Sequence, residues 1–129
     1  LGARIVDSLQ ALVSRNVDPQ DAAVVTVGSF QAGTKHNIIP DEGRLQLTVR
    51  SYRDETRRLL LDGIRRVARG EAIAHGVPED RMPIVEVDED QAADATWNTP
   101  DFTEAMAAVA RRQFGDSRVM QVPPSMGAE

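Results

Sequence analysis

The sequence contains no cysteine, a single lysine and few aromatic residues. Without cysteine it can form neither disulfides nor thiolate zinc sites, and it has no cysteine nucleophile. Its net charge of −5 excludes a broad basic surface for nucleic acid. Apolar runs are only a few residues long, so neither a membrane-spanning segment nor a signal peptide is predicted. Together these features predict a soluble protein of the cytoplasm.

What remains is the composition of an ordinary globular chain. The 129 residues are 41% hydrophobic and 27% charged, which suits one domain, or one small domain with an appendage. The chain does not begin with Met, and residue 1 already belongs to a helical pattern. The last residues, 125–129, contain no element that closes a domain. We therefore expect a piece of a longer polypeptide.

The first half of the chain predicts one helix and two strands. Ile5, Leu9, Leu12 and Val13 recur at helical spacing, and this helix should end near residue 16. A strand is predicted for 23–30 because β-branched residues dominate it, with a bulge or close backbone approach at Gly28. After a loop over 33–43, residues 44–50 alternate strictly between apolar and polar side chains, which is typical of a strand with one buried face.

The second half predicts two further helices. Asp54 is a suitable N-cap for a helix that ends near His75 and Gly76, and Thr99 followed by Pro100 begins another. The latter helix is expected to bury Phe102, Met106, Val109 and Ala110. Residues 83–87 are predicted as a third strand, 118–122 as a short strand, and the polar stretch 88–94 as a linker between domains.

The order of elements before the linker is helix, strand, strand, helix, strand. With one strand in front of it, this order becomes βαββαβ, the split-βαβ arrangement of ferredoxin-like folds. The fold class is therefore α+β, with two helices on an antiparallel sheet.

Most residues that could carry chemistry have simpler structural explanations. His36 and His75 stand alone and match no zinc-ligand spacing. His75 suits a helix C-terminus, where a positive charge is favourable. The acidic run 88–90 lacks the frame of a calcium loop and suits a solvated linker. Trp97 suits a packing anchor better than a platform for a ligand.

Arg50 and Asn37 are the candidate binding residues. Arg50 ends the alternating strand on the face opposite the apolar residues, where its planar guanidinium could receive a carboxylate. Asn37 lies in a loop longer than a hairpin needs, and its side chain offers both a donor and an acceptor. From the residues alone, an exposed strand arginine and an ordinary turn asparagine are the simpler interpretations, and they remain open.

The run Gly33-Thr34-Lys35-His36-Asn37-Ile38-Ile39-Pro40-Asp41, with the strands around it, resembles the lid or dimerisation domain of a metallopeptidase family. That family includes aminoacylases, glutamate carboxypeptidases and hippurate hydrolases, and the N-acyl-amino-acid amidohydrolase branch is the most similar. The resemblance covers nearly the whole chain, because the closing residues 124–129 are similar to a segment of the family's catalytic domain. It implies a lid domain over 1–90 and a piece of an α/β catalytic domain over 91–129.

The resemblance also implies a function. The parent enzyme would cleave the amide bond of N-acyl amino acids with zinc or a similar divalent metal, as a homodimer joined through the lid. Asn37 and Arg50 match the pair that grips the substrate carboxylate. The family's first lid strand and its carbonyl-polarising histidine would precede this chain. No catalytic residue or metal ligand is therefore expected here, and the chain alone should be inactive.

A second hypothesis is a non-catalytic α+β module that dimerises or binds a small ligand. Under both hypotheses residues 24–30 could form a sheet edge that pairs with a copy of itself.

Overall fold

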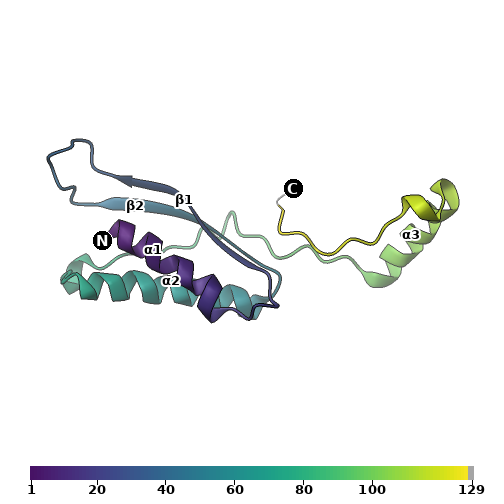
Figure 1. The fold of residues 1–129 in the computed structure, drawn as a ribbon, viewed down its shortest axis with the longest axis horizontal. Coiled ribbons are helices and arrows are strands. Elements are labelled where there is room, and N and C mark those ends of the chain that lie inside the picture. Colours follow the sequence, from purple (N-terminus) through teal and green to yellow (C-terminus); the bar gives the residue numbers. More distant parts are fainter. Residues whose placement is uncertain (128–129) are drawn as a thin grey trace. The chain divides into compact units, whose positions relative to one another are not determined.

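The computed structural model describes residues 1–127, which form two separate compact units. The first unit covers Leu1–Ala93, and the second begins at Asp94. Figure 1 shows the elements in chain order: α1 (Gly2–Asn16), β1 (Ala23–Ala32), β2 (Gly43–Ser51), α2 (Asp54–Ala74), the short 3₁₀ helix η1 (Glu79–Arg81), α3 (Pro100–Phe114) and the 3₁₀ helix η2 (Asp116–Arg118).

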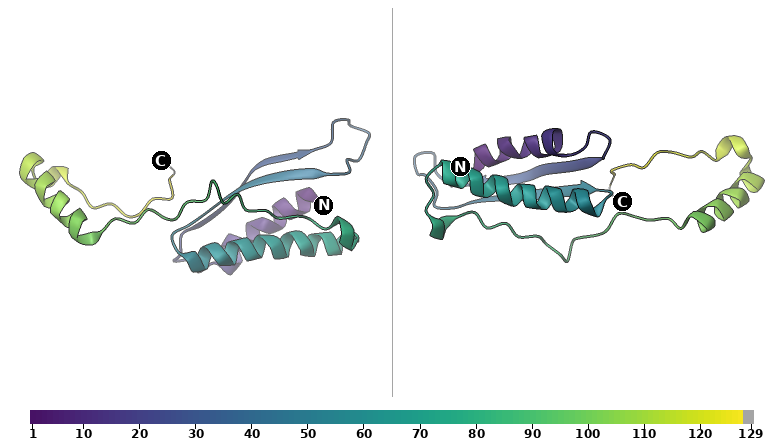
Figure 2. Two further views of the ribbon diagram at one scale, coloured as in Figure 1. Left: turned by 180° about the vertical axis from the view of Figure 1, so that it is seen from behind. Right: turned by 90° about the horizontal axis from the view of Figure 1, so that it is seen from below.

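The first unit has two layers. β1 and β2 form an antiparallel hairpin, and both α1 and α2 lie against the same face of it (Figures 1 and 2). A two-stranded hairpin is marginal in water by itself, so it depends on this helical cover. The α+β class and the two-helix layer expected from the sequence are confirmed, and the arrangement is that of a ferredoxin-like dimerisation domain.

A bulge at Gly28 sets which side chains of β1 face the helices. Val27 pairs with Leu47, but the next pair is Ser29 with Gln46, so Gly28 is the extra residue. The bulge brings Phe30 to the same face as Val27, opposite Leu45. Of the two alternatives predicted for Gly28, a bulge or a close backbone approach, the bulge is confirmed.

The core lies between the helices and the hairpin. Leu9 and Leu12 of α1 and Leu60 of α2 are its most deeply buried large side chains, at 0–2% exposed. The predicted apolar stripe of α1 is thus confirmed. The strands contribute partly buried residues from alternate positions: Val25, Val27, Leu45, Leu47 and Val49. Full burial of such a leucine is worth about 1.5–3 kcal/mol, so this small cluster holds the two layers together.

The two helices meet closely at Gly63. A Cβ atom placed there would lie 2.7 Å from Cδ2 of Leu12, which is too close for a real contact. A Cβ atom placed at Gly70, two turns further along α2, would meet no neighbouring atom within 4 Å. Glycine is therefore required by packing at Gly63 and not at Gly70.

The ends of α2 follow the expected signals with a shift of one residue. Asp54 is the first helical residue and Arg53 is the N-cap, whereas the sequence predicted Asp54 as the cap. The helix ends at Ala74, and Gly76 has φ +68°, the left-handed conformation that favours glycine.

The strand predicted over 83–87 is wrong. The segment has no strand assignment, although Pro83, Val85 and Val87 are partly buried while Ile84 and Glu86 between them are exposed. Val85 packs against the core. The alternating pattern therefore reflects burial of one side, but within residues 1–127 the segment has no ladder of hydrogen bonds to a neighbouring strand.

The second unit corrects three further predictions. No strand forms over 118–122, since η2 occupies 116–118 and irregular chain follows. α3 begins at Pro100 after Thr99 as predicted, but none of its described residues is buried. Phe102 is 67% exposed, Met106 51% and Val109 48%, because nothing in the described part of the unit packs against this apolar stripe. Trp97 is also exposed, at 82%, so it anchors no packing here.

None of the helices formed by residues 1–127 has both the length and the apolarity that crossing a membrane requires. Ala128 and Glu129, the last two residues of the segment that resembles a catalytic domain, lie outside the described residues.

Two alanine substitutions in α2 should have opposite effects on stability. Gly70→Ala should raise the free energy of unfolding by about 0.5–1 kcal/mol, because alanine favours the helix and meets no atom. Gly63→Ala should lower it by about 1–2 kcal/mol, because the added methyl group collides with Leu12. Urea unfolding of both variants measures this difference. Equal stabilisation by the two substitutions would contradict the close helix contact.

Candidate functional site

Arg50 lies on the outer face of the hairpin, which we define as the face turned away from α1 and α2. Leu47 and Val49 pack toward the core, so Thr48 and Arg50 point to the other side of β2. Arg50 is half-buried and pairs with Val24 across the ladder. Its guanidinium is therefore presented from a regular strand, which holds a binding group more firmly than a loop does.

Asn37 lies in the loop that joins the two strands. The backbone turns there, with the N–H of Ile38 donating to the carbonyl oxygen of Lys35 at 3.4 Å. All of loop 33–42 is exposed, and Ile39 is 94% exposed. Asn37 is thus displayed at the tip of the hairpin.

The two predicted binding residues lie at opposite ends of the hairpin. The ladder ends at the loop with the pair Ala32–Gly43, whereas Arg50 belongs to the far end. Seven residue steps separate Gly43 from Arg50, which at about 3.3 Å per step is about 23 Å. One protomer therefore does not bring Asn37 and Arg50 to the same small carboxylate.

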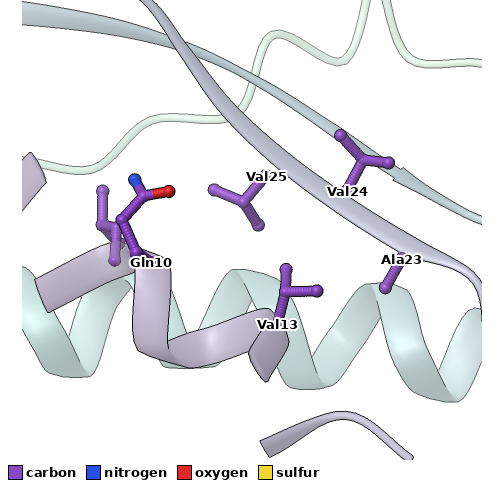
Figure 3. Close-up of a pocket in the computed structure, with 6 residues that line it drawn as sticks. Gln10, Val13, Ala23, Val24 and Val25 are labelled. Atoms are coloured by element: carbon purple, nitrogen blue, oxygen red, sulfur yellow. The ribbon is translucent and has the colours of Figure 1, made fainter. Parts of the chain in front are cut away.

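A shallow groove runs between α1 and β1 (Figure 3). It has a volume of about 230 Å³ and is lined by Leu9, Gln10, Val13, Ala23, Val24 and Val25. Gln10 is its one polar side chain, and no titratable group lines it, so the groove offers no acid or base for catalysis. The sequence analysis did not single out this groove, because only the fold brings the end of α1 beside the start of β1.

The titratable cluster where the middle of α1 meets the end of α2 is also unsuited to nucleophilic catalysis. The hydroxyl of Ser8 donates to Oε1 of Glu71 at 2.5 Å. His75 Nδ1 lies 2.8 Å from the carbonyl oxygen of Glu71 and 3.8 Å from its Oε2. The serine is bonded to the acid and not to the histidine, so no base activates it. The contacts join α1 to the end of α2, consistent with a structural role for His75.

Across residues 1–127, no three side chains of the metal-ligating types gather closely enough to hold an ion. The acidic run 88–90 is engaged separately. Asp88 accepts from Gln91 at 2.7 Å, and Glu89 lies 3.9 Å from Arg57. The described residues therefore do not fit a metal site, and no hydrolytic step can be derived from them.

Comparison with known proteins shows which family this chain resembles. The family model of the peptidase dimerisation domain matches residues 1–75. A hippurate hydrolase from Campylobacter jejuni is 35% identical over 112 residues, which cover 87% of this chain and 28% of that protein. An N-acyl-L-amino acid amidohydrolase from Geobacillus stearothermophilus is 42% identical over 76 residues, which cover 59% of this chain and 20% of that protein.

A solved structure is similar as well. It is the crystal structure of a protein from methicillin-resistant Staphylococcus aureus that is suggested to be an aminohydrolase. The likeness has a TM-score of 0.67 and 30% sequence identity, over 88% of this chain and 28% of that one. The chain thus spans less than a third of the length of these relatives. With more than half of its residues matched by the family model, the chain belongs to the peptidase dimerisation domain family.

Proposed function

We propose that this chain supplies the lid of an amidohydrolase that cleaves the amide bond of N-acyl amino acids such as hippurate. The observation that carries the proposal is the position of Arg50, a half-buried arginine on the outer face of a regular strand. A guanidinium held in this way suits bidentate recognition of a carboxylate, and N-acyl amino acids carry a free carboxylate. The names of the relatives point to the same class of substrate.

In this proposal Asn37 and Arg50 bind one carboxylate from two different subunits. Within one protomer the strand from Gly43, at the end of the loop, to Arg50 is about 23 Å long, which is far longer than a carboxylate. If β1 pairs with its copy about a two-fold axis, the two strands run antiparallel. The loop of one subunit then lies beside the Arg50 end of the other, so that Asn37 of the partner subunit approaches Arg50.

The proposed homodimer forms through the edge of β1 and the adjoining groove. Within the described part of the chain, β1 has a neighbouring strand on one side only, which leaves its other edge for a second copy. The groove beside that edge is apolar except for Gln10, as expected of a surface that is covered by a partner. The family's description as a dimerisation domain supports this assignment.

The hydrolytic chemistry is proposed to reside elsewhere in the parent enzyme. Zinc or a similar divalent metal, bound by residues of the catalytic domain, would activate water when present. We assign residues 1–90 to the lid and 91–129 to the catalytic domain. The exposed stripe of Phe102, Met106 and Val109 supports the second assignment, because such a helix face needs a packing partner. The 129 residues alone are proposed to be inactive.

Arg50→Ala in the full-length enzyme should selectively impair substrates that carry a carboxylate. Losing a bidentate charged contact should cost about 2–5 kcal/mol, or roughly 30- to 4,000-fold in kcat/KM for an N-acyl amino acid. Arg66→Ala is the control, since Arg66 is an exposed arginine of α2, which covers the opposite face of the hairpin. Unchanged kcat/KM in Arg50→Ala would contradict the assignment.

Mixed dimers test whether the site is shared between subunits. Arg50→Ala and Asn37→Ala should each be nearly inactive alone, but co-expression should restore about a quarter of the wild-type activity, because half the dimers are mixed and one of their two sites is intact. If both residues came from one subunit, every site would carry a substitution and activity would not return. Activity of the purified mixture distinguishes the two cases.

Val13→Glu should dissociate the dimer. It places a charge in the groove beside β1, twice per two-fold interface, and should weaken association by several kcal/mol. Leu61→Glu is the matched control, because Leu61 is equally a half-buried aliphatic residue but lies on α2, outside the groove. Sedimentation equilibrium measures the dimer, and circular dichroism checks the fold. A dimer that resists Val13→Glu as well as Leu61→Glu would rule out this interface.

A further inference from the structure

One carboxylate ties the start of β1 to the end of β2. Oδ1 of Asp21 accepts a hydrogen bond from Nη1 of Arg53 at 2.8 Å, and Oδ2 accepts one from the hydroxyl of Thr56 at 3.3 Å. Asp21 lies two residues before β1, whereas Arg53 and Thr56 follow β2. The side chain of Asp21 therefore joins the segment before β1 to the segment after β2. Its two partners are 32 and 35 residues further along the chain.

Arg50 lies at this corner, by which we mean the start of β1 and the end of β2. The ladder pairs Val24 with Arg50 and Ala23 with Ser51, so the two strand ends meet here. Ser51 in turn donates through its hydroxyl to the carbonyl oxygen of Arg53 at 3.3 Å. The ion pair between Asp21 and Arg53 is thus attached to the backbone only three residues beyond Arg50.

The two hydrogen-bond partners of Asp21 differ in burial. Thr56 is 6% exposed, and Asp21 is the partner of its hydroxyl, so loss of this bond would leave a buried polar group unpaired. The side chain of Arg53 is 62% exposed and that of Asp21 is 23% exposed. A pair with one exposed member adds little to stability, so its geometric effect on the corner is the more important one.

We propose that Asp21 is a positioning residue for Arg50. By holding Arg53 and Thr56 together, its carboxylate fixes the turn that follows β2, and with it the point from which the guanidinium of Arg50 projects on the outer face. The inference rests on the proposed role of Arg50 in binding the substrate carboxylate. Displacement of a binding group by about 1 Å is enough to weaken productive binding substantially.

Steady-state kinetics of the full-length enzyme test this role with two substrates, an N-acyl amino acid and the matching carboxamide, which lacks the charge. Asp21→Ala should raise KM for the acid about tenfold or more, with kcat within about twofold, and should change KM for the carboxamide less than about twofold. Asp21→Asn, which keeps the shape and one acceptor, should lie in between. Asp62→Ala is the control, since Asp62 also makes an ion pair with an arginine, Arg65 at 3.1 Å, but within α2 and away from this corner.

Arg53→Met keeps the test valid if Asp21→Ala does not fold. It removes the ion pair between Arg53 and Asp21 but leaves the hydrogen bond from the hydroxyl of Thr56 to Asp21 in place. It should also raise KM for the acid selectively. Equal losses for both substrates, or a lower unfolding temperature with unchanged KM, would show a purely structural role and overturn the inference.

The Arg50→Ala variant in the same assay separates the two proposals. If Arg50→Ala does not discriminate between the acid and the carboxamide, the proposed function itself fails. If Arg50→Ala discriminates but neither Asp21→Ala nor Arg53→Met does, the role of Arg50 stands and the positioning role of Asp21 is wrong.

Discussion

The structure of the first unit depends on burial of one face of a two-stranded hairpin. Two strands cannot form a stable layer in water alone, and here α1 and α2 provide the cover. Leu9, Leu12 and Leu60 fill the space between the layers, and Gly63 allows the helices to approach closely. Because both helices lie on one face, the other face of the hairpin is available to carry polar side chains at defined positions.

The length of the hairpin sets the distance between the residues of the proposed site. A strand has a nearly constant rise per residue, so the separation of Arg50 from the loop is fixed by the number of residues between them. In the proposed site, a single protomer therefore presents the two carboxylate-binding residues at opposite ends of the hairpin. We propose that a two-fold dimer brings Arg50 of one subunit to Asn37 of the other, which would make dimerisation a condition for substrate binding. In the same proposal, the corner held by Asp21 fixes the end of the strand from which Arg50 projects.

Local pattern was sufficient for much of this fold. The strict alternation of 44–50 and the helical spacing of Ile5, Leu9 and Leu12 predicted the elements and their buried faces, and Gly28 predicted the bulge. The pattern of 83–87 was equally strand-like, but a strand exists only when a neighbour pairs with it, and sequence spacing does not reveal the neighbour. The apolar stripe of α3 likewise predicted burial, which depends on what packs against it.

Candidate residues for the proposed site could be chosen from the sequence, but their geometry could not be predicted from it. Arg50 and Asn37 could be chosen from side-chain chemistry and a family resemblance, while their separation followed only from the hairpin register. The most direct test is a crystal structure of the full-length dimer with a non-hydrolysable N-acyl amino acid bound. We expect the carboxylate within hydrogen-bonding distance of Arg50 from one subunit and Asn37 from the other. A carboxylate held by both residues of the same subunit, or by neither, would contradict the account.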